Sequence, residues 1–145
     1  MALALLSCSA EEGHAEISVA NGWTRQIAPG QSTAAIYLTI ANRGDGGDRL
    51  VRVEAAQGEA ALHRSSSAGG VARMRPLENG LEIGARSTMK LMPGGTHIMM
   101  TGLTQPARPG ETFGLTLGFE RSGKRRVSIR VVRADGDGLH SGHGM

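Results

Sequence analysis

Residues 112–119, Thr-Phe-Gly-Leu-Thr-Leu-Gly-Phe, alternate without interruption between large apolar side chains and small or polar ones. Successive side chains of a β-strand point to opposite faces, so this alternation predicts a strand with one apolar face. The run Arg121-Ser-Gly-Lys124 has the composition of a turn, and the alternation resumes beyond it at Val127, Ile129 and Val131. The stretch therefore predicts a β-hairpin with one buried face.

The same two-residue period occurs earlier in the chain. Two further segments place their apolar residues on one face: Ala34, Ile36, Leu38 and Ile40 in the first, and Val51, Val53 and Ala55 in the second. Glycine accounts for 22 of the 145 residues and is concentrated between such segments, and no long stretch has the 3.6-residue period of a helix. The pattern predicts an all-β sandwich or barrel over residues 16–133.

Composition excludes several classes of protein. A single cysteine rules out an internal disulfide, a cysteine-based zinc site and an iron–sulfur cluster. Aromatic residues make up only 3% of the chain, which argues against nucleic-acid binding by base stacking. The net charge is only +3, and Lys124-Arg125-Arg126 is the one basic run, so we expect solvated strand faces and turns and no nucleic-acid partner.

The two ends differ from the body of the chain. Residues 1–15 begin with a short apolar stretch, and Leu5-Leu6-Ser7-Cys8 resembles a bacterial lipoprotein box. We expect a truncated export signal or lipoprotein leader, with Cys8 as a lipidation site and membrane anchor; the alternative is an N-terminal tail with an unmodified thiol. Residues 134–145 are rich in glycine and predict a flexible tail.

Histidine and methionine are the chemically distinctive residues of the body. Alternation places His97 and Met99 on one face of a strand, about 7 Å apart along the chain. His63 and Met74 lie on other predicted strands, and each could add one ligand. Imidazole and thioether donors carry no charge and suit Cu(I), whereas a blue-copper site needs a thiolate that the body lacks. Packing roles for these side chains are the competing interpretation.

The spacing of these residues resembles the PCuAC family of bacterial periplasmic copper chaperones. Ten residues separate His63 from Met74, twenty-two separate Met74 from His97-Ile-Met99, and Pro93-Gly-Gly-Thr-His-Ile-Met-Met-Thr-Gly-Leu103 is the most family-like stretch. The resemblance implies a cupredoxin-like, Greek-key β-sandwich that is not an enzyme. It implies Cu(I) bound by His63, Met74, His97 and Met99, and delivery to a respiratory oxidase subunit or another copper chaperone. Leu62 and Arg64 depart from the family pattern beside His63, which puts the delivery partner in question.

The tail contributes further donors: His140, His143 and Met145. Family members often end in a His- and Met-containing extension, so the resemblance implies a second copper site, which would suit Cu(II); incidental histidines are the alternative. Met89, Met92 and Met100 are expected to pack in the core or at its rim. The competing functions are an extracytoplasmic β-sandwich interaction module without metal and a copper oxidase or reductase, which would need extra nitrogen ligands.

Overall fold

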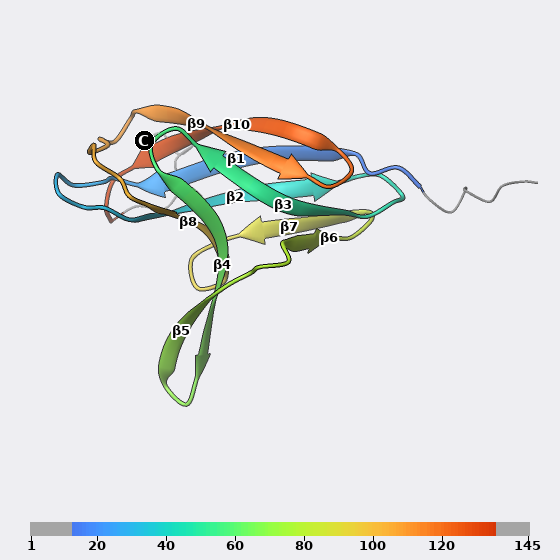
Figure 1. Cartoon of the computed structure of the whole chain (residues 1–145), viewed down its shortest axis with the longest axis horizontal. Helices are drawn as coiled ribbons and strands as arrows, with labels where there is room; N and C mark the ends of the chain where they lie inside the picture. The colour runs from blue at the N-terminus through green and yellow to red at the C-terminus, as the bar shows by residue number, and fades with distance from the viewer. Residues whose placement is uncertain (1–12, 136–145) are drawn as a thin grey trace, which may run out of the picture.

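The structure is a computed structural model that describes residues 13–135. The predicted lipidation site Cys8 and the tail donors His140, His143 and Met145 lie outside the described residues. Ten β-strands occupy the described part of the chain (Figure 1): β1 (Ile17–Arg25), β2 (Ala34–Asn42), β3 (Asp48–Ala55), β4 (Glu59–Ala68), β5 (Val71–Pro76), β6 (Leu81–Ile83), β7 (Ser87–Leu91), β8 (Thr96–Thr101), β9 (Thr112–Phe119) and β10 (Gly123–Val132). The prediction of an all-β fold is confirmed.

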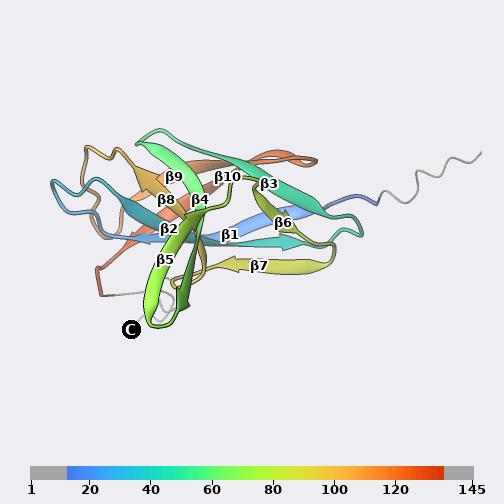
Figure 2. The same ribbon diagram turned by 60° about the horizontal axis from the view of Figure 1, so that its bottom comes forward.

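The strands form one open, mixed sheet that folds over into two layers. Neighbouring strands follow the order β5-β4-β8-β2-β1-β10-β9-β3-β6, and β7 pairs with the part of β2 that β8 leaves uncovered. Only β1 and β10 run parallel among these pairs of the described chain. Figure 2 shows β3, β9 and β10 on one side of the molecule and β2 and β7 on the other. The core lies between these layers.

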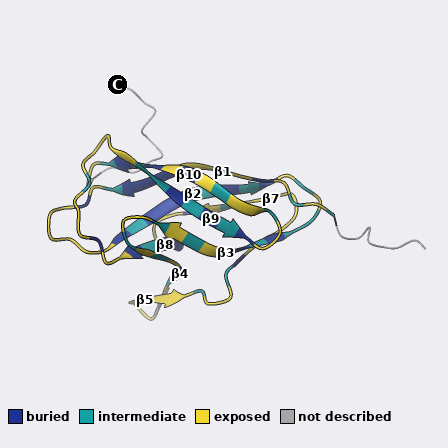
Figure 3. Cartoon of the chain, turned by 45° about the horizontal axis from the view of Figure 1, so that its top comes forward, coloured by how far each residue is buried: buried dark blue, intermediate teal, exposed yellow. Residues whose placement is uncertain are grey.

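The predicted hairpin of residues 112–131 supplies one wall of this core. β9 and β10 pair in antiparallel register from Gly123 opposite Phe119 to Arg130 opposite Thr112. Leu117 and Ile129 have no exposed surface, and neither have Ile36 and Ile40 of β2. Figure 3 shows the buried positions alternating with exposed ones along the strands. Burying one such aliphatic side chain stabilises the fold by about 1.5–3 kcal/mol relative to leaving it in water.

The prediction for the segment around Val51 is wrong at that residue. Val51 is 50% exposed, and Leu50 is buried in its place. The pairing of β3 with β9 shifts between Leu50 and Arg52, which is a β-bulge. A bulge inserts one extra residue and changes which residues face the core. Beyond the bulge, Val53 and Ala55 pack against the core as the alternation predicts.

A buried carboxylate joins β3 to the turn between β9 and β10. Asp48 accepts hydrogen bonds from the hydroxyl and the N–H of Ser122 and from the N–H groups of Arg121 and Arg49. Burial raises the pKa of Asp48, but these hydrogen bonds, that of the Ser122 hydroxyl first, together outweigh burial and hold its pKa below the usual value. The carboxylate therefore stays ionised where it is needed to hold the turn.

The β4–β5 hairpin projects from the sandwich (Figure 1). β5 is at the end of the strand order and every one of its six residues is exposed. The hairpin turns through Gly69 and Gly70, which both have positive φ, a conformation that glycine adopts without strain. None of the described residues forms a helix long and apolar enough to cross a membrane.

Candidate metal centre

The pairing of β4 with β8 brings two of the predicted ligands together. His63 and His97 are direct partners in the antiparallel ladder. Their ring centroids are 6.2 Å apart and their planes differ by only 19°. Cross-strand partners project from the same face of a sheet, so both imidazoles lie side by side on the face opposite the buried Leu62 and Ile98.

The two predicted methionine ligands lie on that same face. Met99 follows His97 by two positions, and its partners on the flanking strands are Ala61 and Ala35. Because both neighbours are small, the face beside the Met99 thioether is left open. Met74 on β5 pairs with Ser65, which is two positions beyond His63. The register therefore places all four predicted ligands on one face of three adjacent strands, with Met74 one step out along the projecting hairpin.

Exposure increases across this face toward the hairpin. His97 is only 4% exposed, His63 and Met99 are half-buried, and Met74 is 52% exposed. Met100 has no exposed surface, which confirms the prediction that it packs in the core. Met89 is partly buried against the core, as predicted, whereas Met92 is 45% exposed at the rim.

The backbone orients both imidazoles. The Nδ1 atom of His97 lies 3.1 Å from the carbonyl oxygen of Gly95, and that of His63 lies 3.4 Å from the carbonyl oxygen of Ala61. In the tautomer that makes these bonds, Nδ1–H donates to the carbonyl and Nε2 keeps its lone pair. Metal-binding histidines are commonly held in this way through the other ring nitrogen. The residues present therefore fit a metal ion bound through Nε2.

Two aromatic side chains extend the row of histidines, and neither was predicted from the sequence to belong to the site. The ring of Tyr37 on β2 lies 6.3 Å from that of His97, and Trp23 on β1 lies 4.7 Å from Tyr37. Both are buried. The alternation within residues 34–40 already placed Tyr37 on the face opposite Ile36 and Leu38, and this was the signal that could have found it.

The chemistry of the donor set is soft and uncharged. Within residues 13–135, no three side chains among His, Cys, Asp and Glu lie close enough together to hold a metal ion without methionine. The face described above thus combines two imidazoles with neighbouring thioethers and no carboxylate ligand. Such donors bind Mg²⁺ and Ca²⁺ poorly and favour Cu(I).

Known proteins share this architecture. The copper-bound PCuAC domain from PmoF2 is 22% identical, superposes with a TM-score of 0.67, and is matched over 83% of this chain and 98% of that one. The solution structure of CuI-DR1885 from Deinococcus radiodurans is 27% identical with a TM-score of 0.62, over 79% of this chain and 76% of that one. The fold is thus of the PCuAC type, a cupredoxin-like β-sandwich, which confirms the resemblance seen in the sequence.

The family follows from sequence similarity. A family model described as "Putative lipoprotein LpqE-like" matches residues 17–131. "Putative lipoprotein Lxx21020" of Leifsonia xyli subsp. xyli is 30% identical over 116 residues, which cover 79% of this chain and 69% of that protein. The chain belongs to the LpqE-like family.

Proposed function

We propose that this protein is a copper chaperone that binds one Cu(I) through His63, Met74, His97 and Met99. The observation that carries the proposal is the pair of imidazoles on β4 and β8, each with Nδ1 directed at a backbone carbonyl. Neutral nitrogen and thioether donors match a monovalent, soft cation. The copper-bound PCuAC domain from PmoF2 and the CuI-DR1885 structure support copper as the cargo.

The gradient of exposure indicates how the ion would be released. His97 is the buried end of the set and Met74 is the exposed end. An acceptor protein would therefore reach the Met74 side first and exchange its own donors for those of this chain, one ligand at a time. We propose delivery to the copper centre of a respiratory oxidase subunit or to another copper chaperone, with no catalytic turnover on this chain.

We further propose that the protein works outside the cytoplasm, in the periplasm or an equivalent compartment, and is anchored to the membrane through lipidated Cys8. The family description as a lipoprotein supports this placement. The tail donors His140, His143 and Met145 would bind a second copper as Cu(II), because imidazole-rich, thiolate-free sites suit that ion.

Anaerobic titration of the full chain with Cu(I), in competition with a chromophoric chelator, tests the proposal. We expect one tightly bound Cu(I), and weaker binding in His63→Ala and in His97→Ala. His14→Ala is the matched control, because His14 is an exposed histidine whose backbone N–H donates a hydrogen bond to Asp45 in the connection between β2 and β3. If His63→Ala and His97→Ala bind Cu(I) as tightly as the parent does, the two histidines are not ligands. If the parent binds no Cu(I), the protein is an interaction module without this metal site.

A further inference from the structure

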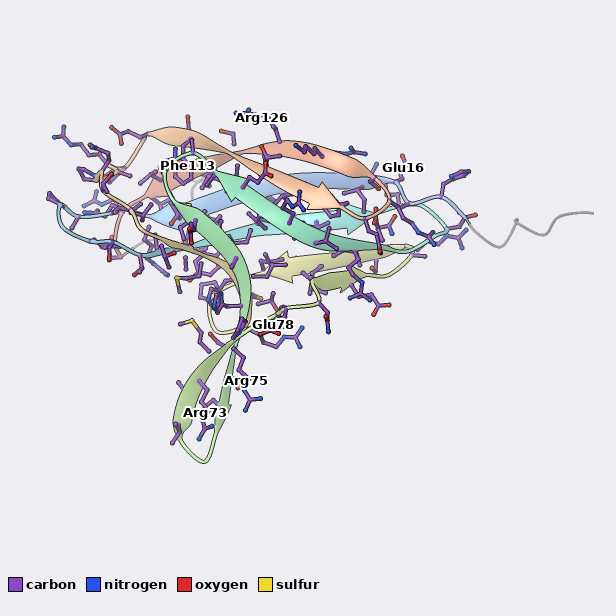
Figure 4. All side chains as sticks on the ribbon, viewed as in Figure 1. Glu16, Arg73, Arg75, Glu78, Phe113 and Arg126 are labelled. Atoms are coloured by element: carbon purple, nitrogen blue, oxygen red, sulfur yellow. The ribbon has the colours of Figure 1, made fainter. Side chains whose placement is uncertain are left out.

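The projecting β4–β5 hairpin has two chemically different faces. The register places His63, Ser65, Met74 and Pro76 on one face, which carries the proposed copper ligands. The opposite face carries Arg64, Arg73 and Arg75, all exposed. Figure 4 shows Arg73 and Arg75 on the part of the hairpin that stands away from the sandwich.

This cluster of positive charge is not neutralised within the described part of the chain. None of the three arginines forms an ion pair with a carboxylate of residues 13–135, whereas Arg133 pairs with Asp135. Arg64 donates one hydrogen bond, from Nε to the hydroxyl of Thr96. Glu78, the first carboxylate after the hairpin, is labelled near its base in Figure 4 and pairs with none of them.

The arrangement of the arginines works against the stability of the hairpin. Arg64 and Arg75 are direct cross-strand partners, and like charges in that position destabilise a sheet. Charges on an exposed edge strand also prevent edge-to-edge aggregation, and this accounts for Arg73 and Arg75 on β5. It does not account for Arg64, which lies on β4, inside the edge. A negatively charged ligand that contacts all three arginines would offset the repulsion between their positive charges.

We propose that Arg64, Arg73 and Arg75 form a docking surface for an acidic face of the protein that exchanges copper with this chain. The planar guanidinium group binds a carboxylate through two parallel hydrogen bonds, which suits arginine to this task. The inference rests on the proposed function for the identity of the partner, but the recognition of acidic side chains is a separate property of the hairpin.

The position of the arginines favours a protein partner over a membrane surface. Met74 stands between Arg73 and Arg75 in the sequence and projects from the other face of the same two-stranded ribbon. A carboxylate bound to the arginines would therefore lie on the opposite face of β5 from Met74, the most exposed of the proposed copper ligands. Val71 is the one large apolar side chain on the arginine face of β5, which offers little for insertion into a bilayer.

The direct test uses an oligoglutamate peptide as the probe and the ¹⁵N-labelled full chain as the target. We expect the peptide to shift the amide resonances of residues 64–75, and these shifts to disappear when Arg64, Arg73 and Arg75 are all changed to glutamine. The matched control changes three other exposed arginines to glutamine: Arg52, Arg121 and Arg126. Figure 4 shows Arg126 on the far side of the sandwich from the hairpin.

Three outcomes would overturn the proposal. The first is that the control variant loses the peptide response as much as the hairpin variant does. The second is that the peptide leaves residues 64–75 unshifted. The third is that vesicles containing phosphatidylglycerol shift these residues while oligoglutamate does not, because the surface would then bind anionic lipid.

A second measurement separates this inference from the proposed function. Cu(I) is transferred from the loaded chain to a di-cysteine peptide flanked either by glutamates or by glutamines. Electrostatic steering raises association rates by tenfold or more, so we expect the three-arginine variant to lose about tenfold in rate with the acidic acceptor and little with the neutral one. Its Cu(I) affinity in chelator competition should equal that of the parent. If the parent and the three-arginine variant transfer Cu(I) to the acidic acceptor at the same rate, the docking surface is rejected and the copper site stands, whereas failure of the parent to bind Cu(I) would reject the proposed function alone.

Discussion

His63 and His97 stand opposite each other on β4 and β8, with ring centroids 6.2 Å apart and both Nδ1 atoms turned to backbone carbonyls. The two rings are therefore ordered by strand pairing before any ion arrives. A site built on paired strands holds its donors more rigidly than one built on loops, and rigid donors lose less entropy on binding.

The first prediction compares two adjacent methionines. Met99→Leu removes a thioether from the face that carries the histidines, whereas Met100→Leu removes one from the core with little change in volume. We expect Met99→Leu to weaken Cu(I) binding by about tenfold or more. Removing only the hydrogen-bond partner of a metal ligand already lowers metal affinity by about tenfold, and this variant removes a ligand itself. Met100→Leu should leave it unchanged. Equal Cu(I) affinities of the two variants in chelator competition would remove Met99 from the ligand set.

Part of this face could be predicted from the sequence. Alternation alone put His97 and Met99 on one side of their strand and Met100 on the other, because side-chain direction in a strand depends only on the parity of position. It could not show that His63 is the partner of His97. That pairing depends on the register of β4 against β8, and the register is set by the turns and by the core residues Leu62 and Ile98, which also pair.

The second prediction uses the single tryptophan as a reporter. Trp23 contacts Tyr37, whose ring in turn lies beside His97, so an ion bound by His97 shifts the environment of the indole. We expect Cu(I) to change the Trp23 emission in proportion to the copper bound. Tyr37→Phe keeps the ring and should keep the response, and Tyr37→Leu should reduce it. An emission spectrum that stays constant at full copper occupancy would show that the aromatic row is not coupled to the metal.

The third prediction concerns pH and stability. The hydrogen bonds to Asp48 lower its pKa in the folded state, so its ionised form stabilises the fold above the unfolded value of 3.8, and this contribution is lost as the pH falls through the lower folded pKa. Hydrogen bonds to charged groups contribute about 1.5–3 kcal/mol, so Asp48→Asn should lower the free energy of unfolding by a similar amount at pH 7. The difference should shrink in acid.

Urea unfolding at pH 7 and at progressively lower pH measures this difference. Glu82→Gln is the control, because it removes one exposed carboxylate from the neighbouring strand β6. If Asp48→Asn and Glu82→Gln unfold at the same urea concentration at pH 7, the buried carboxylate does not hold the β9–β10 turn.

The fourth prediction concerns the tail. Truncation after Arg133 removes His140, His143 and Met145 and should abolish a second copper equivalent, measured as Cu(II), while the Cu(I) site keeps its affinity. Tethered ligands act at an effective concentration of about millimolar, so the tail could pass its ion to the site on the sheet once an external electron donor has reduced Cu(II) to Cu(I). Equal Cu(II) stoichiometry for the truncated and full-length proteins, by equilibrium dialysis, would make the tail a bystander.

Two further features could not be predicted from the sequence, each for a physical reason. Val51 follows the apolar alternation perfectly, but the bulge between Leu50 and Arg52 turns it outward, and a bulge leaves no mark in a simple two-residue period. The grouping of three arginines on one face of the hairpin could not be predicted, because Arg64 is separated in the sequence from Arg73 and Arg75. Only the pairing of β4 with β5 brings the three charges together.

With the proposed ligand set, the pairing of β4 with β8 also makes copper binding depend on folding. Of the four proposed Cu(I) ligands, only His97 and Met99 are near neighbours in an unfolded chain, and two donors hold an ion weakly. The remaining donors join them once two strands far apart in the sequence have found their register. A nascent, damaged or misfolded copy would therefore carry little Cu(I), and Cu(I) would be delivered only by molecules that have completed folding.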